Sequence, residues 1–299
     1  MKLGKRLLIL GTFVGLISCN TTMDKKTVEV QGHRGDQGYF PANTIPGFIS
    51  ATQMGVDVLE LDVVISSDNK VVVSHEPYMK ASYVNLPNGT PISKTEEKAY
   101  NLYTMPYDSI KKFDVGTRKN NSFPEQKHQE LYKPLLAEVF TEVEKYIKAN
   151  SLPPIKYNIE IKSAAKQYDK FQPVPSVFVD LVMKEVKAFG LEENINIQSF
   201  DPEVLEQMHK NYPHIKLAYL VGKGTFEENM NKLSFAPEIY SPNYKLLTDE
   251  KTVVEIKNKK MQVIPWTVND TTEMKRLIAI NVNGIITDYP NKLLKILED

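Results

Sequence analysis

Two pairs of charged residues lie two positions apart inside short apolar runs of this sequence. Glu60 and Asp62 flank one apolar residue, and Glu160 and Lys162 flank another. Because side chains alternate faces along a β-strand, the members of each pair would point to the same face of a sheet. A carboxylate on a buried face costs free energy unless it is paired, solvated or bound to a metal. These positions are therefore candidates for a functional site.

The three acids Glu60, Asp62 and Glu160 together predict a site for one divalent cation. Carboxylates suit Mg²⁺ or Ca²⁺, which prefer oxygen ligands, and the set contains none of the His or Cys ligands that zinc usually takes. The alternative is a structural network in which the same acids form ion pairs with Arg34 and Lys162. The polar residues around the acids favour the metal site.

Two histidines, His33 and His75, are the last residues of predicted strands close to these acids. With a pKa of about 6.5, imidazole can both accept and release a proton near neutral pH, so the pair predicts a general base and a general acid. A histidine at a strand end can instead be a structural hydrogen-bonding residue. We interpret the remaining histidines, which lie in polar or helical segments, as surface residues; they are His128, His209 and His214.

Arg34 and Lys162 would place two positive charges beside the same acids. The planar guanidinium group of an arginine matches phosphate oxygens, and a lysine ammonium supplies a second cation. Combined with a metal and two proton carriers, this charge pattern predicts an anionic substrate and phosphoryl transfer.

A barrel of parallel strands is the architecture that would bring these residues together. From residue 28 onward, apolar β-branched runs alternate with segments of helical period, which is typical of βα units. The expected strands are 28–33, 58–65 with a companion at 71–75, 157–161, 195–199, 217–221, 238–241, 262–267 and 284–287. The expected helices are 44–54, 135–149, 174–189, 202–210, 226–233, 249–258, 272–279 and 292–297. Eight units predict an α/β fold, the (β/α)8 TIM barrel, whose reactive groups lie at the C-terminal ends of the strands.

The segment 78–132 interrupts this alternation. It is rich in Asn, Pro, Lys and Tyr and is too polar for two barrel units. We interpret it as an insertion after the second strand, with one helix at 107–113. Long loops in compact domains are either functional or disordered, so the insertion either caps the mouth of the barrel or has no role in the site.

The first 19 residues are expected to be a signal peptide. Three basic residues precede an apolar stretch at 7–17, which is shorter than the ~20 residues that a membrane-spanning helix needs. The sequence Leu-Ile-Ser-Cys at 16–19 resembles the bacterial lipobox, which implies lipidation of Cys19. The alternative is a soluble export signal with an incidental cysteine. We expect an exported protein, anchored by lipid to the cell envelope on its periplasmic or extracellular face.

The polar residues 20–27 would form a tether between this anchor and a catalytic domain at 28–299. Cys19 is the only cysteine, so the mature protein would have no internal disulfide. Lys+Arg and Asp+Glu both number 37, and without the three basic residues of the leader the balance is 34 against 37, a net charge of −3. Without a basic surface field, nucleic acid is not an expected partner.

Six blocks of the sequence carry a resemblance to a known family. The first combines Gly32-His33-Arg34-Gly35 with segments 41–44, 60–63 and 72–75, and the later blocks are 134–140, 158–162, 198–201, 266–269 and 284–290. In this order they resemble the conserved blocks of glycerophosphodiester phosphodiesterases, from Val30 to Pro290. The resemblance implies a TIM barrel that hydrolyses a small glycerophosphodiester to glycerol 3-phosphate and an alcohol.

The resemblance also implies roles for individual residues, and these roles agree with the chemistry above. The implied acid/base pair is His33 and His75, the metal ligands are Glu60, Asp62 and Glu160, and the substrate is bound by Arg34, Lys162 and Trp266. Trp266 would line a glycerol pocket, although a buried core tryptophan is the alternative. The implied reaction is attack on phosphorus by the neighbouring glycerol hydroxyl, followed by hydrolysis of the cyclic product.

The sequence departs from the family pattern at two positions. Ala42 stands where the family usually has Glu, and Glu76 stands where Asp commonly follows the second histidine. The Ala42 change is expected to affect rate and substrate preference, because residues that orient a site commonly matter about 10- to 100-fold. Two other functions remain open: a phospholipase acting on intact lipid, and a noncatalytic lipoprotein that binds a phosphorylated polyol.

Overall fold

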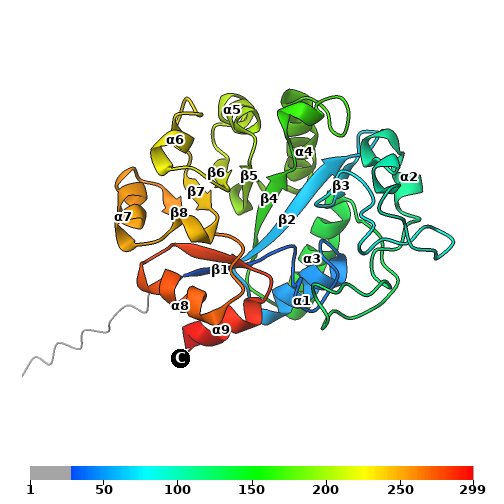
Figure 1. The fold of residues 1–299 in the computed structure, drawn as a ribbon, viewed down its shortest axis with the longest axis horizontal. Coiled ribbons are helices and arrows are strands. Elements are labelled where there is room, and N and C mark those ends of the chain that lie inside the picture. The colour runs from blue at the N-terminus through cyan, green and yellow to red at the C-terminus, as the bar shows by residue number, and fades with distance from the viewer. Residues whose placement is uncertain (1–27, 299) are drawn as a thin grey trace, which may run out of the picture.

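The computed structural model describes residues 28–298, in which parallel strands form a ring surrounded by helices (Figure 1). The strands are β1 (Glu29–Gly32), β2 (Val58–Ile65), β3 (Val71–Val73), β4 (Lys156–Ile161), β5 (Ile195–Ser199), β6 (Lys216–Val221), β7 (Ile239–Pro242), β8 (Gln262–Val263) and β9 (Gly284–Thr287). The helices are α1 (Ile45–Met54), α2 (Tyr107–Ile110), α3 (Leu136–Asn150), α4 (Pro175–Phe189), α5 (Pro202–Asn211), α6 (Phe226–Met230), α7 (Glu250–Asn258), α8 (Thr271–Ala279) and α9 (Pro290–Glu298). The predicted signal peptide, tether and Cys19 lie outside the described residues.

The strands pair in the order β8-β7-β6-β5-β4-β2-β1-β9, and all of these pairs are parallel. The ring closes between β8 and β9, where the Asn283 backbone N–H donates to the Val263 carbonyl at 2.8 Å. The short β3 pairs with β2 in the antiparallel direction. The predicted (β/α)8 TIM barrel is therefore confirmed.

Most of the predicted elements end within two residues of the observed ones. The largest difference is β8, which was expected to run over 262–267 and ends at Val263. Pro265 has no backbone N–H to donate to a neighbouring strand, which interrupts the regular ladder at this point. The expected helix at 107–113 also ends early, at Ile110.

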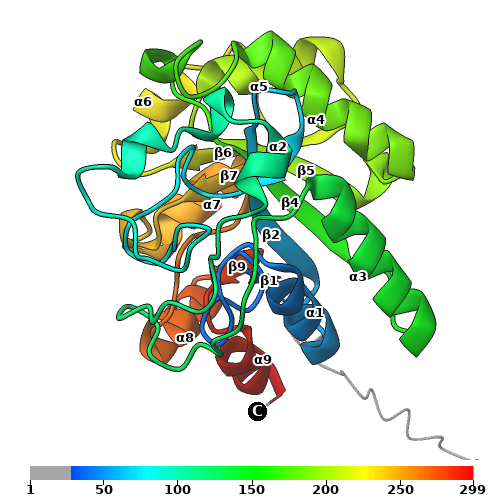
Figure 2. The ribbon, with the colours of Figure 1, turned by 90° about the vertical axis from the view of Figure 1, so that its right-hand side faces the viewer.

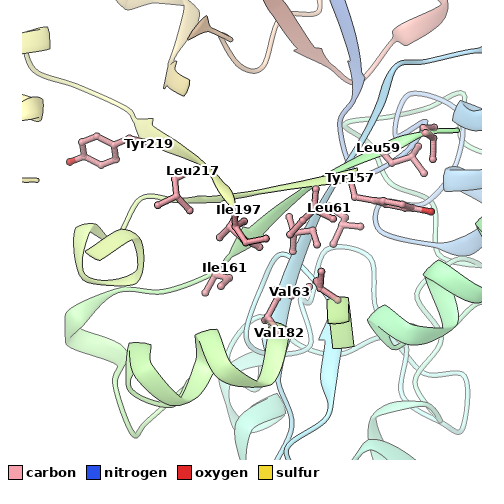
Figure 3. Packing of buried hydrophobic residues seen from close by; sticks show 14 of the residues in the cluster. Leu59, Leu61, Val63, Tyr157, Ile161, Val182, Ile197, Leu217 and Tyr219 are labelled. Carbon is pink, nitrogen blue, oxygen red and sulfur yellow. The ribbon is translucent and has the colours of Figure 1, made fainter. Parts of the chain in front are cut away.

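The main hydrophobic core lies between the outer face of the barrel and the surrounding helices. Leu61, Val63 and Ile161 gather there with Val182 of α4, as Figure 3 shows. Because faces alternate along a strand, the same register turns Glu60 and Asp62 into the barrel.

Phe140 on α3 is fully buried in this core, with its ring centroid 4.9 Å from that of Tyr157 and 5.3 Å from that of Phe189. We expect Phe140→Ala to lower the free energy of unfolding by about 3–5 kcal/mol, because it removes buried apolar surface and leaves a cavity. Chemical denaturation measures this change. Val177→Ala, at an exposed position of α4, is the control and should change stability by less than about 0.5 kcal/mol.

The segment 78–132 packs as a cap with its own apolar cluster. Met79, Leu102 and Ile110 are fully buried in this cluster, against Val72 of β3. In Figure 1 the arrowhead of β2 points toward this segment, and Figure 2 shows the segment in front of the strands. The insertion therefore lies over the C-terminal ends of the strands. Within residues 28–298, no helix has the length and apolar character needed to cross a membrane.

Candidate active site

The structure brings the predicted site residues together at the C-terminal ends of β1, β2 and β4 and after β3. One pocket at this end is lined by His33, Arg34, Glu60, His75, Glu160, Lys162 and Trp266. Asp62 is fully buried next to it. Strand register explains the closeness of two of the acids, because Asp62 on β2 is paired directly with Glu160 on β4.

Glu60, Asp62 and Glu160 form a compact, buried carboxylate cluster. Their ligand oxygens all lie within 4.8 Å of one another, and the three residues are 1%, 0% and 6% exposed. Arg34 Nε lies 3.1 Å from Asp62 Oδ2, and Lys162 Nζ donates to Glu160 Oε1 at 2.6 Å. Two cations therefore face three carboxylates, which leaves one negative charge uncompensated.

The uncompensated charge belongs to Glu60. Its Oε2 accepts from the Arg34 backbone N–H at 2.9 Å and its Oε1 from Gln198 Nε2 at 2.8 Å, but in the described structure no Lys or Arg side-chain nitrogen lies within 4.0 Å. Burial raises the pKa of Glu60 well above its usual value, and the neighbouring Asp62 and Glu160 add to this. The Asp62 pKa is lowered, because the nearby Arg34 and other cations outweigh the effect of its burial.

The residues present fit a hard divalent cation. Asp62 Oδ1 is buried and accepts no hydrogen bond within the described residues, and Lys162 Nζ is 3.7 Å away from it. All three candidate ligands offer oxygen, which Mg²⁺ and Ca²⁺ prefer. A bound cation would also compensate the charge of Glu60, which a purely structural ion network leaves unbalanced.

Asn43 fixes the position of Asp62, and sequence reasoning gave it no role. Its Nδ2 donates to Asp62 Oδ2 at 2.8 Å, and its Oδ1 accepts from the Asp62 backbone N–H at 3.2 Å. Asn43 has φ 59° and Arg34 has φ 52°, in the left-handed region that few non-glycine residues adopt. Such strained backbone is often found at functional sites.

His33 is oriented by an acid that sequence reasoning also missed. Its Nδ1 lies 2.5 Å from Asp288 Oδ1, and Asn269 Nδ2 donates to the other oxygen of Asp288 at 2.6 Å. This leaves His33 Nε2 on the side of Glu60, 3.9 Å from Oε2. Burial lowers the pKa of His33 and the adjacent Arg34 lowers it further, while Asp288 opposes both. The signal available in the sequence was the position of Asp288, directly after β9.

His75 lies at the entrance of the same pocket, with a side chain 33% exposed. Its Nδ1 is 3.2 Å from Glu76 Oε1, and Glu76 Oε2 accepts from the Tyr83 hydroxyl at 2.7 Å. The departure from Asp to Glu at position 76 therefore keeps a carboxylate beside the histidine. The pKa of Glu76 is lowered, since His75 and its other partners outweigh burial.

Trp266 lines the pocket and also packs on the barrel interior. Its ring meets that of Phe200 edge to face, with centroids 5.3 Å apart, and its Nε1 donates to the Ser241 carbonyl at 2.9 Å. Trp266 also packs against a small apolar cluster that includes Ile264 and Ile286. Trp266 is therefore partly buried and lines the pocket, and its contact with glycerol stays a prediction.

The remaining three histidines are exposed, as the sequence indicated. His209 stacks on Phe235 with ring centroids 3.9 Å apart, on the outside of the barrel. The site histidines are thus set apart from the others by their carboxylate neighbours.

Comparison with known proteins decides the family. Residues 33–292 match the model of the glycerophosphoryl diester phosphodiesterase family. The chain belongs to this family. A glycerophosphodiester phosphodiesterase of Caldanaerobacter subterraneus is 30% identical over 268 residues, which cover 90% of this chain and 97% of that protein. As a member of the family, the chain is a phosphoric diester hydrolase that acts on glycerophosphodiesters.

Solved structures agree with the fold. A family member from Silicibacter pomeroyi has a TM-score of 0.81 at 25% identity, with 92% of this chain and 94% of that one covered. An Oleispira antarctica phosphodiesterase in complex with the product sn-glycerol-3-phosphate has a TM-score of 0.71 at 21% identity, with 91% and 97% covered. At this identity, the likeness to the Oleispira antarctica protein shows that the two chains share a fold.

Proposed function

We propose that the protein hydrolyses glycerophosphodiesters to sn-glycerol 3-phosphate and an alcohol, with His33 and His75 as proton carriers and one divalent cation, Mg²⁺ or Ca²⁺. The observation that carries this proposal is the placement of two histidines around a buried carboxylate cluster with one uncompensated charge. Arg34 and Lys162 would bind phosphate oxygens, and Trp266 with Phe200 would contact the glycerol.

The two histidines differ in a way that suits opposite tasks. Asp288 would accept a hydrogen bond from the Nδ1–H of His33, so the lone pair of Nε2 would be free to take a proton from the glycerol hydroxyl that attacks phosphorus. Its lowered pKa keeps His33 neutral near pH 7, as a base must be. His75 is more exposed and would protonate the leaving alcohol. In the second step the roles reverse, and water opens the cyclic phosphate.

The cation, when bound at Glu60, Asp62 and Glu160, would polarise the phosphoryl oxygens and stabilise developing negative charge. Asn43 and Gln198 hold two of these carboxylates in place through the hydrogen bonds described above.

A substrate panel tests this function. The purified protein should release sn-glycerol 3-phosphate from glycerophosphocholine and glycerophosphoethanolamine in the presence of Mg²⁺ or Ca²⁺. No turnover of either compound with either cation would contradict the proposal. Turnover of intact phospholipid alone would indicate the phospholipase instead. An apolar rim for lipid chains does not favour that function, because Phe200 is the only exposed large apolar side chain among residues 28–298 that lines the pocket.

Asp288 is expected to act through His33. Asp288→Asn keeps the size of the side chain but loses the charge that orients the imidazole and stabilises its protonated form. We expect kcat to fall about 10- to 100-fold, in the range seen for residues that orient a catalytic group, with little change in KM. Steady-state kinetics at several pH values measures this, and the acidic limb of the pH profile should move as well. Unchanged kcat and profile would assign Asp288 a structural role only.

We also propose that export removes residues 1–18 and leaves Cys19 as a lipid-anchored N-terminus, as the basic, apolar and Leu-Ile-Ser-Cys segments indicate. Wild-type protein should then fractionate with membranes, and Cys19→Ser should abolish incorporation of a labelled fatty acid. Labelling that persists in the variant would contradict the anchor.

A further inference from the structure

A second pocket adjoins the candidate active site and contains three cationic side chains. It lies between the barrel and the insertion, and its cationic residues are Arg34, Arg118 and Lys133. In the described structure no Asp or Glu lines it. We call it the cationic pocket. Arg34 and His75 line both this pocket and the one that holds the carboxylate cluster, so the two pockets meet at the position predicted for the phosphate.

Lys133 is the unusual member of this set, because it is only 4% exposed and has no carboxylate within ion-pair distance among the described residues. Its Nζ donates to Ser74 Oγ at 2.8 Å. The nearest acids are already engaged: Glu76 by Tyr83 and Asp62 by Arg34. Burial lowers the pKa of Lys133 to about 8, while Glu76 and Asp62 partly oppose this. A buried ammonium group with no carboxylate in ion-pair contact is costly, and a ligand anion would relieve that cost.

Ala42 contributes to the anion-binding character of this pocket. Ala42 lines the pocket together with Arg34, and among the described residues no acidic side chain lines it to neutralise the cations. On the insertion side, Arg118 is half-buried, and within residues 28–298 its Nη1 reaches only the Val84 carbonyl, at 3.5 Å. Arg118 therefore retains donors that can turn to a bound anion.

We propose that the cationic pocket binds the leaving alcohol of the substrate and selects alcohols that carry a second phosphate group. This inference rests on the proposed function. The scissile phosphate would lie between His75 and Arg34, which line both pockets. The glycerol would then contact Trp266 and Phe200 in the pocket of the carboxylate cluster, and the leaving alcohol would extend into the cationic pocket. A cationic choline headgroup would meet three positive charges there, whereas a phosphorylated alcohol would be attracted.

The test compares two substrates that differ in one group: glycerophosphoglycerol, and the same molecule phosphorylated on its distal glycerol. Wild-type protein should cleave the phosphorylated compound with the higher kcat/KM. Lys133→Met should reduce kcat/KM for that compound by about 10- to 100-fold, as expected for loss of a charge-assisted hydrogen bond, and change it less than about threefold for the other. Lys112→Met, an exposed lysine of the insertion outside the pocket, is the control.

If thermal unfolding shows that Lys133→Met is poorly folded, two further variants keep the test decisive. Arg118→Gln should lower the ratio of kcat/KM for the phosphorylated compound to kcat/KM for glycerophosphoglycerol. Ala42→Glu should lower the same ratio and raise activity on glycerophosphocholine. Equal cleavage of both compounds by wild-type protein, or equal losses on both in all variants, would overturn the inference and leave the proposed function standing. If wild-type protein cleaved no glycerophosphodiester at all, the proposed function would fail, and the inference with it.

Discussion

Glu60→Gln is expected to abolish most activity while leaving the metal-free protein as stable as the wild type or more stable. Glu60 is buried, has no Lys or Arg partner within the described residues, and has a pKa raised by burial and by two neighbouring acids. Removing its charge removes an electrostatic cost in the metal-free protein. It would also remove one of the three proposed metal ligands, so we expect kcat/KM to fall about 10³-fold, since metal stabilisation of the reacting phosphate contributes several kcal/mol.

This variant separates the two interpretations that the sequence left open. In a structural ion network, replacing the carboxylate that has no cationic partner would not affect activity. Activity, metal affinity by calorimetry and unfolding by denaturant should be measured on the same preparation. Glu142→Gln on α3, which changes an acid outside the site whose side chain is 45% exposed, is the control and should leave all three unchanged. Full activity in Glu60→Gln would contradict the metal site.

His33→Gln and His75→Gln are each expected to lower kcat by about 10²- to 10⁴-fold, the usual contribution of a positioned general acid or base. The structural reason is that each imidazole lines the pocket beside the carboxylate cluster and faces its own acid, Asp288 or Glu76. The double variant should lose less than the product of the two single losses, because residues that act in one step are not additive.

The matched control is His209→Gln, which changes an exposed histidine stacked on Phe235 outside the site. It should keep full activity. If either site variant also kept full activity, that histidine would not be a proton carrier, although the hydrolase function would stand. Metal content should be measured in parallel, so that loss of the cation is not mistaken for loss of a proton carrier.

The part of the site that the sequence predicts is the part that local periodicity controls. Glu60 and Asp62 flank Leu61 on one strand, and a period of two places them inside the barrel as soon as Leu61 is assigned to the core. Burial of Leu61 against the helices is what the structure shows. Both site histidines could be predicted in the same way, because they lie at the ends of predicted strands and the C-terminal ends of parallel strands meet at one face of the barrel.

The features that the sequence did not predict depend on contacts between distant segments. His33 and Asp288 are 255 positions apart and meet because β1 pairs with β9. Asn43 reaches Asp62 through a backbone in the left-handed region, which no period or composition indicates. Lys133 reads as one more lysine in a polar segment, and only the packing of the insertion on the barrel buries it. Side-chain partners across a barrel require its register and closure, which local patterns leave undetermined.

The most direct test of a metal-dependent phosphodiesterase at this cluster is a titration of the metal-free protein with Mg²⁺ or Ca²⁺, followed by release of sn-glycerol 3-phosphate from glycerophosphocholine. We expect no turnover after treatment with a chelator and recovery of full activity as one equivalent of cation binds. Undiminished hydrolysis by the metal-free protein, or recovery that is independent of Glu60, would contradict the assignment of Glu60, Asp62 and Glu160 as the site of the cation.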